Sequence, residues 1–109
     1  MKPGRKFSSF TRQEVAQLFV RAQAKIRIPG FRILRAPTSS AYGKILIVIP
    51  RRVGNAPTRN LIRRRIKSIF REKKIYQFSY DFIIIVGPES AGISFAEIHR
   101  LLTTAAKCP

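Results

Sequence analysis

The 109-residue chain carries 22 Lys and Arg against 5 Asp and Glu, a formal net charge of +17, and its length fits one small domain over residues 1–109. Its apolar content of 45% is ordinary for a globular protein, which excludes a disordered basic tail. The electrostatic field of so positive a protein attracts phosphate groups, so we expect a nucleic-acid partner. The apolar runs at residues 45–49 and 82–86 are far shorter than the roughly 20 residues that span a bilayer, so we expect no membrane partner.

The first predicted helix covers residues 11–23. Thr11 and Glu14 stand at the spacing of a capping box, and apolar residues follow at helical intervals. Three β-prone segments come next, separated by turn residues, and we expect them to form an antiparallel meander. These segments cover residues 25–28, 31–35 and 44–49.

The second predicted helix carries most of the information about function. Asn55 can cap it, Pro57 is tolerated in its first turn, and it should run to about Lys74. At 3.6 residues per turn one side is apolar and the other is basic, with only Glu72 nearby to relieve the repulsion. Arginine dominates the basic side, and its guanidinium matches phosphate geometry, so this side is interpreted as an RNA-binding surface. The apolar side holds Ile62, Ile66, Ile69 and Phe70, and the basic side holds Asn60, Arg63, Arg64, Lys67, Arg71 and Lys74.

The last two elements are a strand and a helix. Residues 80–86 form a strongly apolar fourth strand that Gly87 and Pro88 end. Ser94 and Glu97 then repeat the capping-box spacing and open a final helix. The predicted order of elements is therefore αβββαβα.

Side chains that perform acid–base or metal chemistry are scattered along the sequence. The carboxylates do not pair by spacing, and His99 has no Cys, His or Asp at ligand spacing. The single Cys108 excludes an internal disulfide and a cysteine zinc site. From this scatter we expect the protein to have no catalytic and no metal-binding residue of its own. The N-terminus lacks an apolar signal core, so we expect a cytoplasmic protein.

A longer pattern carries a family resemblance. The run Arg51-Arg52-Val53-Gly54-Asn55-Ala56, followed by Arg59-Asn60 and Ile62-Arg63-Arg64, is similar to the basic pair, Gly-Asn-Ala turn and Arg-Asn helix start of the bacterial ribonuclease P protein family. Asp81 before an apolar strand matches the same family, and the resemblance covers nearly the whole chain.

The resemblance implies a fold. It is an α+β two-layer sandwich with a four-stranded sheet, of the type seen in domain 2 of ribosomal protein S5. The helix between the strands at residues 44–49 and 80–86 would make a left-handed βαβ crossover, although about 98% of such connections are right-handed.

The resemblance also implies a function. The family's RNA subunit carries the phosphodiester chemistry with bound Mg²⁺, and the protein helps it to remove the 5′ leader of precursor tRNA. The implied partners are the ribonuclease P RNA subunit and precursor tRNA, with no obligate protein partner. Mg²⁺ would be bound mainly by the RNA subunit, and the protein alone would be inactive.

Site residues follow from the same resemblance. The leader would lie in a cleft between the first helix and the sheet, lined by Phe19, Leu34 and Lys44. Leu61 replaces a usual basic residue, so one phosphate contact is lost or moves to Arg65. Val15 and Leu34 replace aromatic residues, so stacking on leader bases should be weaker. The residues implied to contact the catalytic RNA are Arg51, Arg52, Asn55, Arg59, Asn60, Arg63, Arg64 and Lys67.

Two alternatives stay open at this point. A small basic ribosomal protein would share the fold class and would bind structured ribosomal RNA without assisting turnover. A phosphodiesterase acting by itself is disfavoured, because the sequence offers no acid–base or metal-ligand cluster. Phe19 could be part of the core instead of a stacking surface, whereas Phe31 and Phe70 are expected in the core.

Overall fold

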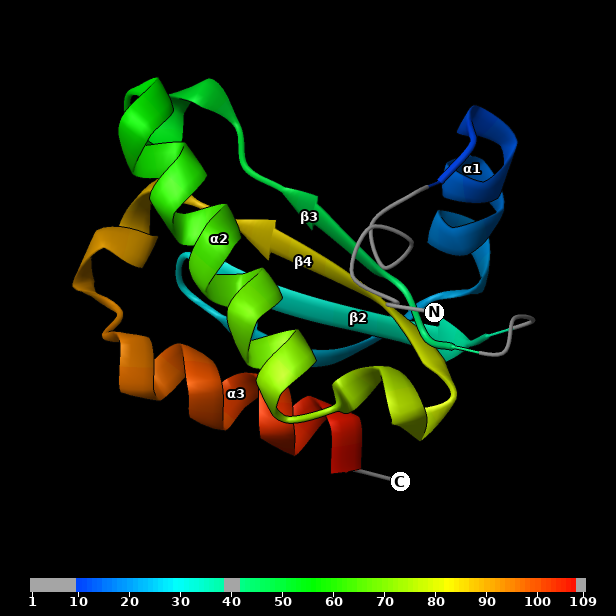
Figure 1. The fold of residues 1–109 in the computed structure, drawn as a ribbon. Helices are drawn as coiled ribbons and strands as arrows, with labels where there is room; N and C mark the ends of the chain where they lie inside the picture. Colours follow the sequence, from blue (N-terminus) through cyan, green and yellow to red (C-terminus); the bar gives the residue numbers. More distant parts are fainter. Residues whose placement is uncertain (1–9, 39–41, 108–109) are drawn as a thin grey trace.

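The computed structural model describes residues 10–38 and 42–107, and it shows a four-stranded mixed sheet with helices on both faces (Figure 1). The order αβββαβα is as predicted, and within the described residues short 3₁₀ helices occupy three of the connections. The elements are α1 (Arg12–Arg21), β1 (Gln23–Ile28), β2 (Phe31–Pro37), β3 (Ile45–Val48), η2 (Arg51–Val53), α2 (Ala56–Glu72), η3 (Ile75–Phe78), β4 (Tyr80–Val86), η4 (Pro88–Gly92) and α3 (Phe95–Lys107).

The helices begin where the sequence suggests their caps. The Thr11 hydroxyl accepts a hydrogen bond from the Glu14 backbone N–H (3.1 Å), and the Glu14 carboxylate accepts one from the Thr11 N–H (2.8 Å), which confirms the capping box. Asn55 caps α2 as predicted. Ser94 accepts from the Glu97 N–H (3.1 Å), but the Glu97 carboxylate pairs with an arginine one turn later, so only half of the second capping box is present.

The strand order is β1-β2-β4-β3, which corrects one prediction. β1 pairs antiparallel with β2 as expected, but the second neighbour of β2 is β4, and among the described residues β3 pairs with β4 alone, in parallel. The expected three-strand meander is therefore wrong in its third strand. The physical reason is burial: β4 is buried on both faces along most of its length, which is the pattern of a central strand, whereas β3 is only partly buried.

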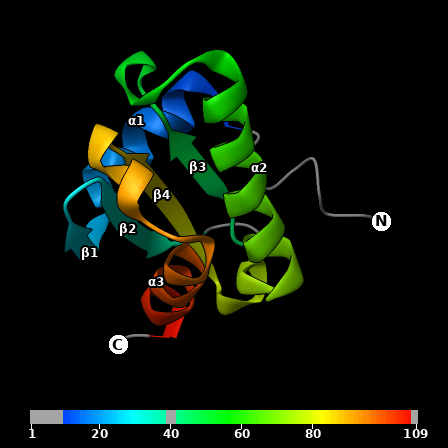
Figure 2. The same ribbon diagram turned by 90° about the vertical axis from the view of Figure 1, so that its left-hand side faces the viewer.

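The connection through α2 has an uncommon hand. It joins the parallel strands β3 and β4, with α2 packed on one face of the sheet. Seen from the α2 side with both strands pointing up, β4 lies to the left of β3, so the crossover is left-handed (Figures 1 and 2). The family resemblance therefore predicts the hand correctly where the general rule does not.

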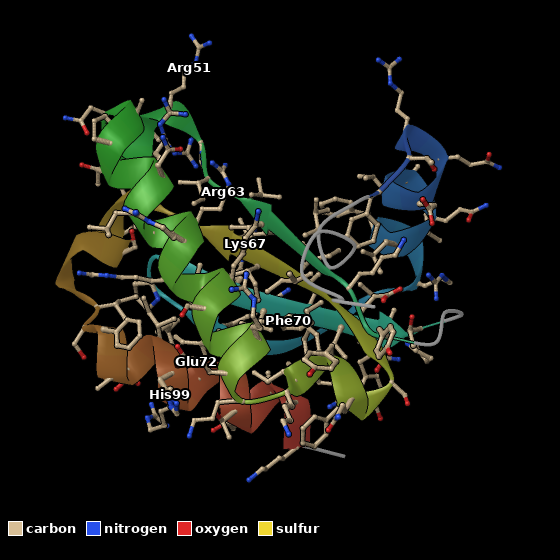
Figure 3. The ribbon with its side chains drawn as sticks, in the orientation of Figure 1. Arg51, Arg63, Lys67, Phe70, Glu72 and His99 are labelled. Atoms are coloured by element: carbon tan, nitrogen blue, oxygen red, sulfur yellow. The ribbon has the colours of Figure 1, made fainter. Side chains whose placement is uncertain are left out.

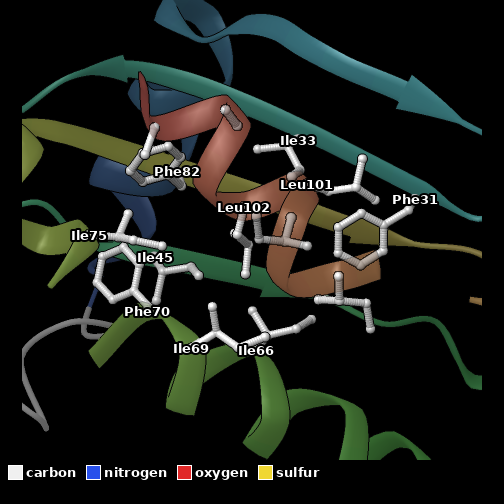
Figure 4. Packing of buried hydrophobic residues seen from close by; sticks show 14 of the residues in the cluster. Phe31, Ile33, Ile45, Ile66, Ile69, Phe70, Ile75, Phe82, Leu101 and Leu102 are labelled. Atoms are coloured by element: carbon white, nitrogen blue, oxygen red, sulfur yellow. The ribbon is translucent and has the colours of Figure 1, made fainter. Parts of the chain in front are cut away.

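The sheet buries apolar side chains on both faces. On one face, α2 and α3 close the main core, in which Phe31, Ile66, Phe70 and Phe82 are fully buried (Figure 4). On the other face, Leu18 of α1 packs in a second, smaller cluster. The predicted two-layer arrangement thus describes the sheet with α2 and α3, and α1 adds a partial third layer.

One cation lies inside this core. Arg35 is 5% exposed, and its Nη1 donates to the carbonyl of Ala105 (2.8 Å) in the last turn of α3. Its guanidinium carbon also lies 4.0 Å from the ring centroid of Tyr80. The partial negative charge at the helix C-terminus and the aromatic face compensate the buried charge, so Arg35 ties the end of α3 to β2.

Candidate nucleic-acid interface

The residues implied to contact RNA gather at the start of α2 and in the turn before it. Figure 3 shows Arg51 at this end of the helix and Arg63 and Lys67 farther along it. Arg65 lies on the side of α2 that faces α3, since its guanidinium carbon is 5.8 Å from the centroid of the Phe95 ring. We call the resulting surface the basic face; it consists of Arg51, Arg52, Asn55, Arg59, Asn60, Arg63, Arg64 and Lys67.

The positive charges of the basic face have no carboxylate partners. Across residues 10–38 and 42–107, the ion pairs are Lys44 with Glu14 and Arg100 with Glu97, and neither involves this surface. Glu72, the acidic residue nearest in sequence, accepts a hydrogen bond from the Ser68 hydroxyl (3.0 Å). The repulsion between the arginines is therefore not relieved by pairing with a carboxylate, and a polyanion would relieve it.

Within the basic face, Arg63 Nη1 donates a hydrogen bond to Asn60 Oδ1 (3.4 Å), and two further residues are hydrogen-bonded to the backbone at the corner before α2. The Asn55 side-chain oxygen accepts from the Thr58 N–H (3.0 Å), which caps α2. Arg59 is half-buried, and its Nε donates to the Gly54 carbonyl (3.2 Å). Both bonds fix the corner between η2 and α2 and thereby set the direction in which the helix presents its other cations. Arg51, Arg52, Asn60 and Arg64 are exposed, and Arg63 and Lys67 are half-buried.

We predict that Asn55→Ala lowers the free energy of unfolding by about 1 kcal/mol, because it removes the cap of α2. Asn55→Ser should keep the cap, the stability and the affinity for RNA. Denaturant unfolding and RNA binding, measured on both variants, check this expectation. If Asn55→Ser is as stable as the parent but binds RNA as weakly as Asn55→Ala, the amide contacts RNA directly and the capping explanation fails.

The residues implied to contact the leader lie around α1 and the sheet face beneath it. Phe19 is 44% exposed on α1, so it does not belong to the core. Leu34 is half-buried in the small cluster beneath α1, and Lys44 lies just before β3. A cavity of about 100 Å³ opens beside Lys44, but neither Phe19 nor Leu34 lines it. Its walls are Phe10, Glu14, Gln17, Leu18, Arg21, Lys44 and Asp81.

Lys44 has an acidic neighbour that the sequence does not reveal. Its Nζ lies 3.6 Å from Glu14 Oε2 and 5.2 Å from the ring centroid of Phe10. Hydrogen bonds from the backbone N–H and then the hydroxyl of Thr11, followed by the charge of Lys44, hold the pKa of Glu14 below its ordinary value. Asp81 is buried and accepts from the Lys44 backbone N–H (2.8 Å), which fixes the start of β3. An RNA phosphate at Lys44 would therefore compete with Glu14.

The described residues do not provide a metal site. Within residues 10–38 and 42–107, no group of three or more His, Cys, Asp or Glu side chains could hold a metal ion. The Mg²⁺ that the resemblance implies therefore does not fit a site built by this part of the protein alone. In the same part of the chain, no helix has the length and apolarity to cross a membrane.

Comparison with known proteins identifies the family. The sequence model of the family described as Ribonuclease P matches residues 6–108. A ribonuclease P protein component from Borrelia duttonii is 36% identical over 94 residues, which cover 84% of this chain and 82% of that protein.

Solved structures agree on the fold. The ribonuclease P protein from Thermotoga maritima superposes with a TM-score of 0.76 at 20% identity, covering 94% of this chain and 97% of that one. The Staphylococcus aureus protein gives a TM-score of 0.78 at 18% identity, covering 93% of each chain. The family match extends over both the basic face and the sheet that carries it, and we conclude that this chain belongs to the ribonuclease P protein family.

Proposed function

We propose that this protein binds the catalytic RNA of ribonuclease P through the basic face and assists the removal of the 5′ leader from precursor tRNA. The observation that carries the proposal is the uncompensated charge of the basic face in a chain whose family is established. Membership of the family makes the protein a component of an endoribonuclease. The cleavage itself, in this proposal, belongs to the RNA, with Mg²⁺ held mainly by RNA oxygens.

The proposed contribution of the protein is electrostatic. Two RNAs must approach each other for leader removal, and their phosphates repel. Arg63, Arg64 and Lys67 would reduce this repulsion and lower the Mg²⁺ concentration that holds substrate and catalyst together. Asn55 and Arg59 would act by fixing the corner that orients α2. Because both RNA partners are cytoplasmic in bacteria, the proposed location is the cytoplasm.

Reconstitution tests this function. Purified protein is added to a bacterial ribonuclease P RNA and precursor tRNA, at a Mg²⁺ concentration where the RNA alone cleaves the precursor very slowly. The proposal expects release of the leader and a mature tRNA 5′ end. A protein that only holds structured ribosomal RNA would bind RNA without stimulating cleavage, and that outcome would reject the proposal.

The leader would be held by the face of the sheet near α1. Phe19 offers an exposed ring, and Leu34 offers an apolar side chain on the sheet. Lys44 would add a cation after exchanging Glu14 for a leader phosphate. The departures at Val15 and Leu34 leave fewer rings than the family pattern, so Phe19 should carry most of the base stacking.

We predict that Phe19→Ala weakens the binding of leader-bearing precursor tRNA to the holoenzyme and leaves mature tRNA unaffected. Loss of one base stack costs about 1 to 3 kcal/mol, so the effect should be measurable as a clear rise in Kd. Val20→Ala is the matched control, since Val20 is 86% exposed on the same helix. Equal losses for precursor and mature tRNA would show that Phe19 does not contact the leader.

A further inference from the structure

A second concave surface lies at the end of the sheet opposite the Lys44 cavity. It opens where β2 begins and β4 ends, between the tight turn that joins β1 to β2 and the 3₁₀ helices η2 and η4. Figure 2 faces this end of the molecule. We call it the hairpin-end pocket; its volume is about 350 Å³, and it is lined by Ile28, Gly30, Phe31, Arg32, Pro50, Arg52, Ile85, Val86, Gly87, Pro88 and Glu89.

The rim of this pocket is tightly packed. The Gly87 N–H donates to the Gly30 carbonyl (2.9 Å), which joins the β1–β2 turn to the end of β4. Gly30 has a φ of +84°, and a Cβ there would lie 2.4 Å from the Ser90 backbone nitrogen. A side chain at Gly30 would therefore collide with the backbone of η4, so glycine is required for the close approach that shapes the pocket.

The pocket combines charge with apolar surface. Arg32 from β2 and Arg52 from η2 are both exposed, and neither forms an ion pair within the described ranges. Pro50 and Pro88 are also lining residues, and so is Glu89, which forms no ion pair with either arginine within the described ranges. Guanidinium groups match a phosphate, and apolar rings suit the face of a base. The volume lies near the lower end of the roughly 300–1,000 Å³ range of ligand pockets, so it fits one nucleotide and not a duplex.

Arg52 identifies the RNA from which this nucleotide would come. It belongs to both the basic face and the pocket lining, so the two surfaces are continuous. We propose that the hairpin-end pocket holds one unpaired nucleotide of the catalytic RNA, with its phosphate between Arg32 and Arg52 and its base against the prolines. The nucleotide must be unpaired, because only an unstacked base can enter such a pocket. This inference rests on the proposed function and adds Arg32 as an RNA-binding residue.

The decisive comparison is between two neighbouring arginines. Arg27 lies directly opposite Arg32 in the β1–β2 register and is also exposed, but it does not line the pocket. Arg32→Gln should weaken binding of the catalytic RNA about tenfold, whereas Arg27→Gln, which removes the same charge, should have less than about a twofold effect. Equal losses would mean that only total charge matters, and the pocket assignment would fail.

Chemical probing of the RNA backbone gives an independent readout. In the complex with the parent protein, one unpaired nucleotide should be protected from 2′-hydroxyl acylation. It should become reactive with Arg32→Gln and stay protected with Arg27→Gln, each variant being used at saturating concentration. Arg32→Lys provides a further variant, because lysine keeps the charge but lacks the planar guanidinium group that forms paired hydrogen bonds with a phosphate. Its protection of the nucleotide should lie between those of Arg32→Gln and Arg27→Gln.

The outcomes separate the two proposals. If the parent protein does not bind the catalytic RNA, the proposed function fails. If it binds and both arginine variants leave the protections unchanged, only the pocket proposal is overturned. A loss confined to leader-bearing precursor tRNA, with normal binding of the catalytic RNA, would also overturn it, because the occupant would then be the leader.

Discussion

Reversing two charges on α2, Arg63→Glu with Arg64→Glu, should weaken binding to the catalytic RNA by roughly 100-fold at moderate salt. Both side chains lie on the basic face, where no carboxylate compensates them. Each lost phosphate contact also removes released counterions, so the slope of log K against log salt should become shallower by roughly 1 per contact. Titrations at several salt concentrations measure both quantities.

The matched control changes the net charge equally at another place. Lys73 and Lys107 are exposed at the C-terminal ends of α2 and α3. Lys73→Glu with Lys107→Glu should leave the affinity within about threefold, because long-range charge is screened beyond about 10 Å at 0.1 M salt. The melting temperature of each variant shows whether the fold is intact. Similar losses in both double variants would mean that the basic face is not a specific contact.

Complete removal of the RNA should abolish cleavage. The described residues contain no cluster of carboxylates, histidines or cysteines that could hold a metal ion, and the sequence shows no paired acid and base. Our proposal assigns the activation of water and the stabilisation of the leaving oxygen at the phosphodiester to the RNA subunit. Protein purified free of RNA should release no leader from precursor tRNA at any Mg²⁺ concentration.

A nuclease-treated preparation checks this expectation. Its activity should be absent and should return only when catalytic RNA is added. His99→Ala is the informative variant, because His99 is the single histidine of the chain and its backbone carbonyl, not its ring, forms the hydrogen bond to Thr103. Cleavage by RNA-free protein that His99→Ala abolishes would place the chemistry in the protein and refute the proposal.

Local signals predicted the elements, but they did not predict how distant strands pair. Tyr80–Val86 is the strand expected from its apolar run and the Gly87-Pro88 stop, and α2 starts at the predicted Asn55 cap. The pairing of β3 with β4 joins Ile45 to Phe82 across the whole of α2, and no local pattern encodes such a contact. The prediction that the first three strands form an antiparallel meander was wrong for this reason.

The site shows the same division. Helical periodicity alone put Arg63, Arg64 and Lys67 on one polar side of α2. Periodicity could not show that Arg59 bonds the Gly54 carbonyl, because that contact depends on the corner that η2 makes. The pairing of Lys44 with Glu14 was hidden too, since it joins α1 to the start of β3. Residue types that bind phosphate can be recognised in a sequence, but their partners in the free protein require the fold.

The edge position of β3 bears on how the chain folds during synthesis. Within the part of the chain that the structure describes, the one strand paired with β3 is β4, and β4 follows the whole of α2 in the sequence. A chain emerging from the ribosome would thus expose Ile45–Val48 and the arginines of α2 before the strand that completes the sheet has been made. Contacts between residues so far apart form slowly, and unpaired apolar strands aggregate. The density of positive charge beside β3 would then keep nascent chains apart until β4 arrives.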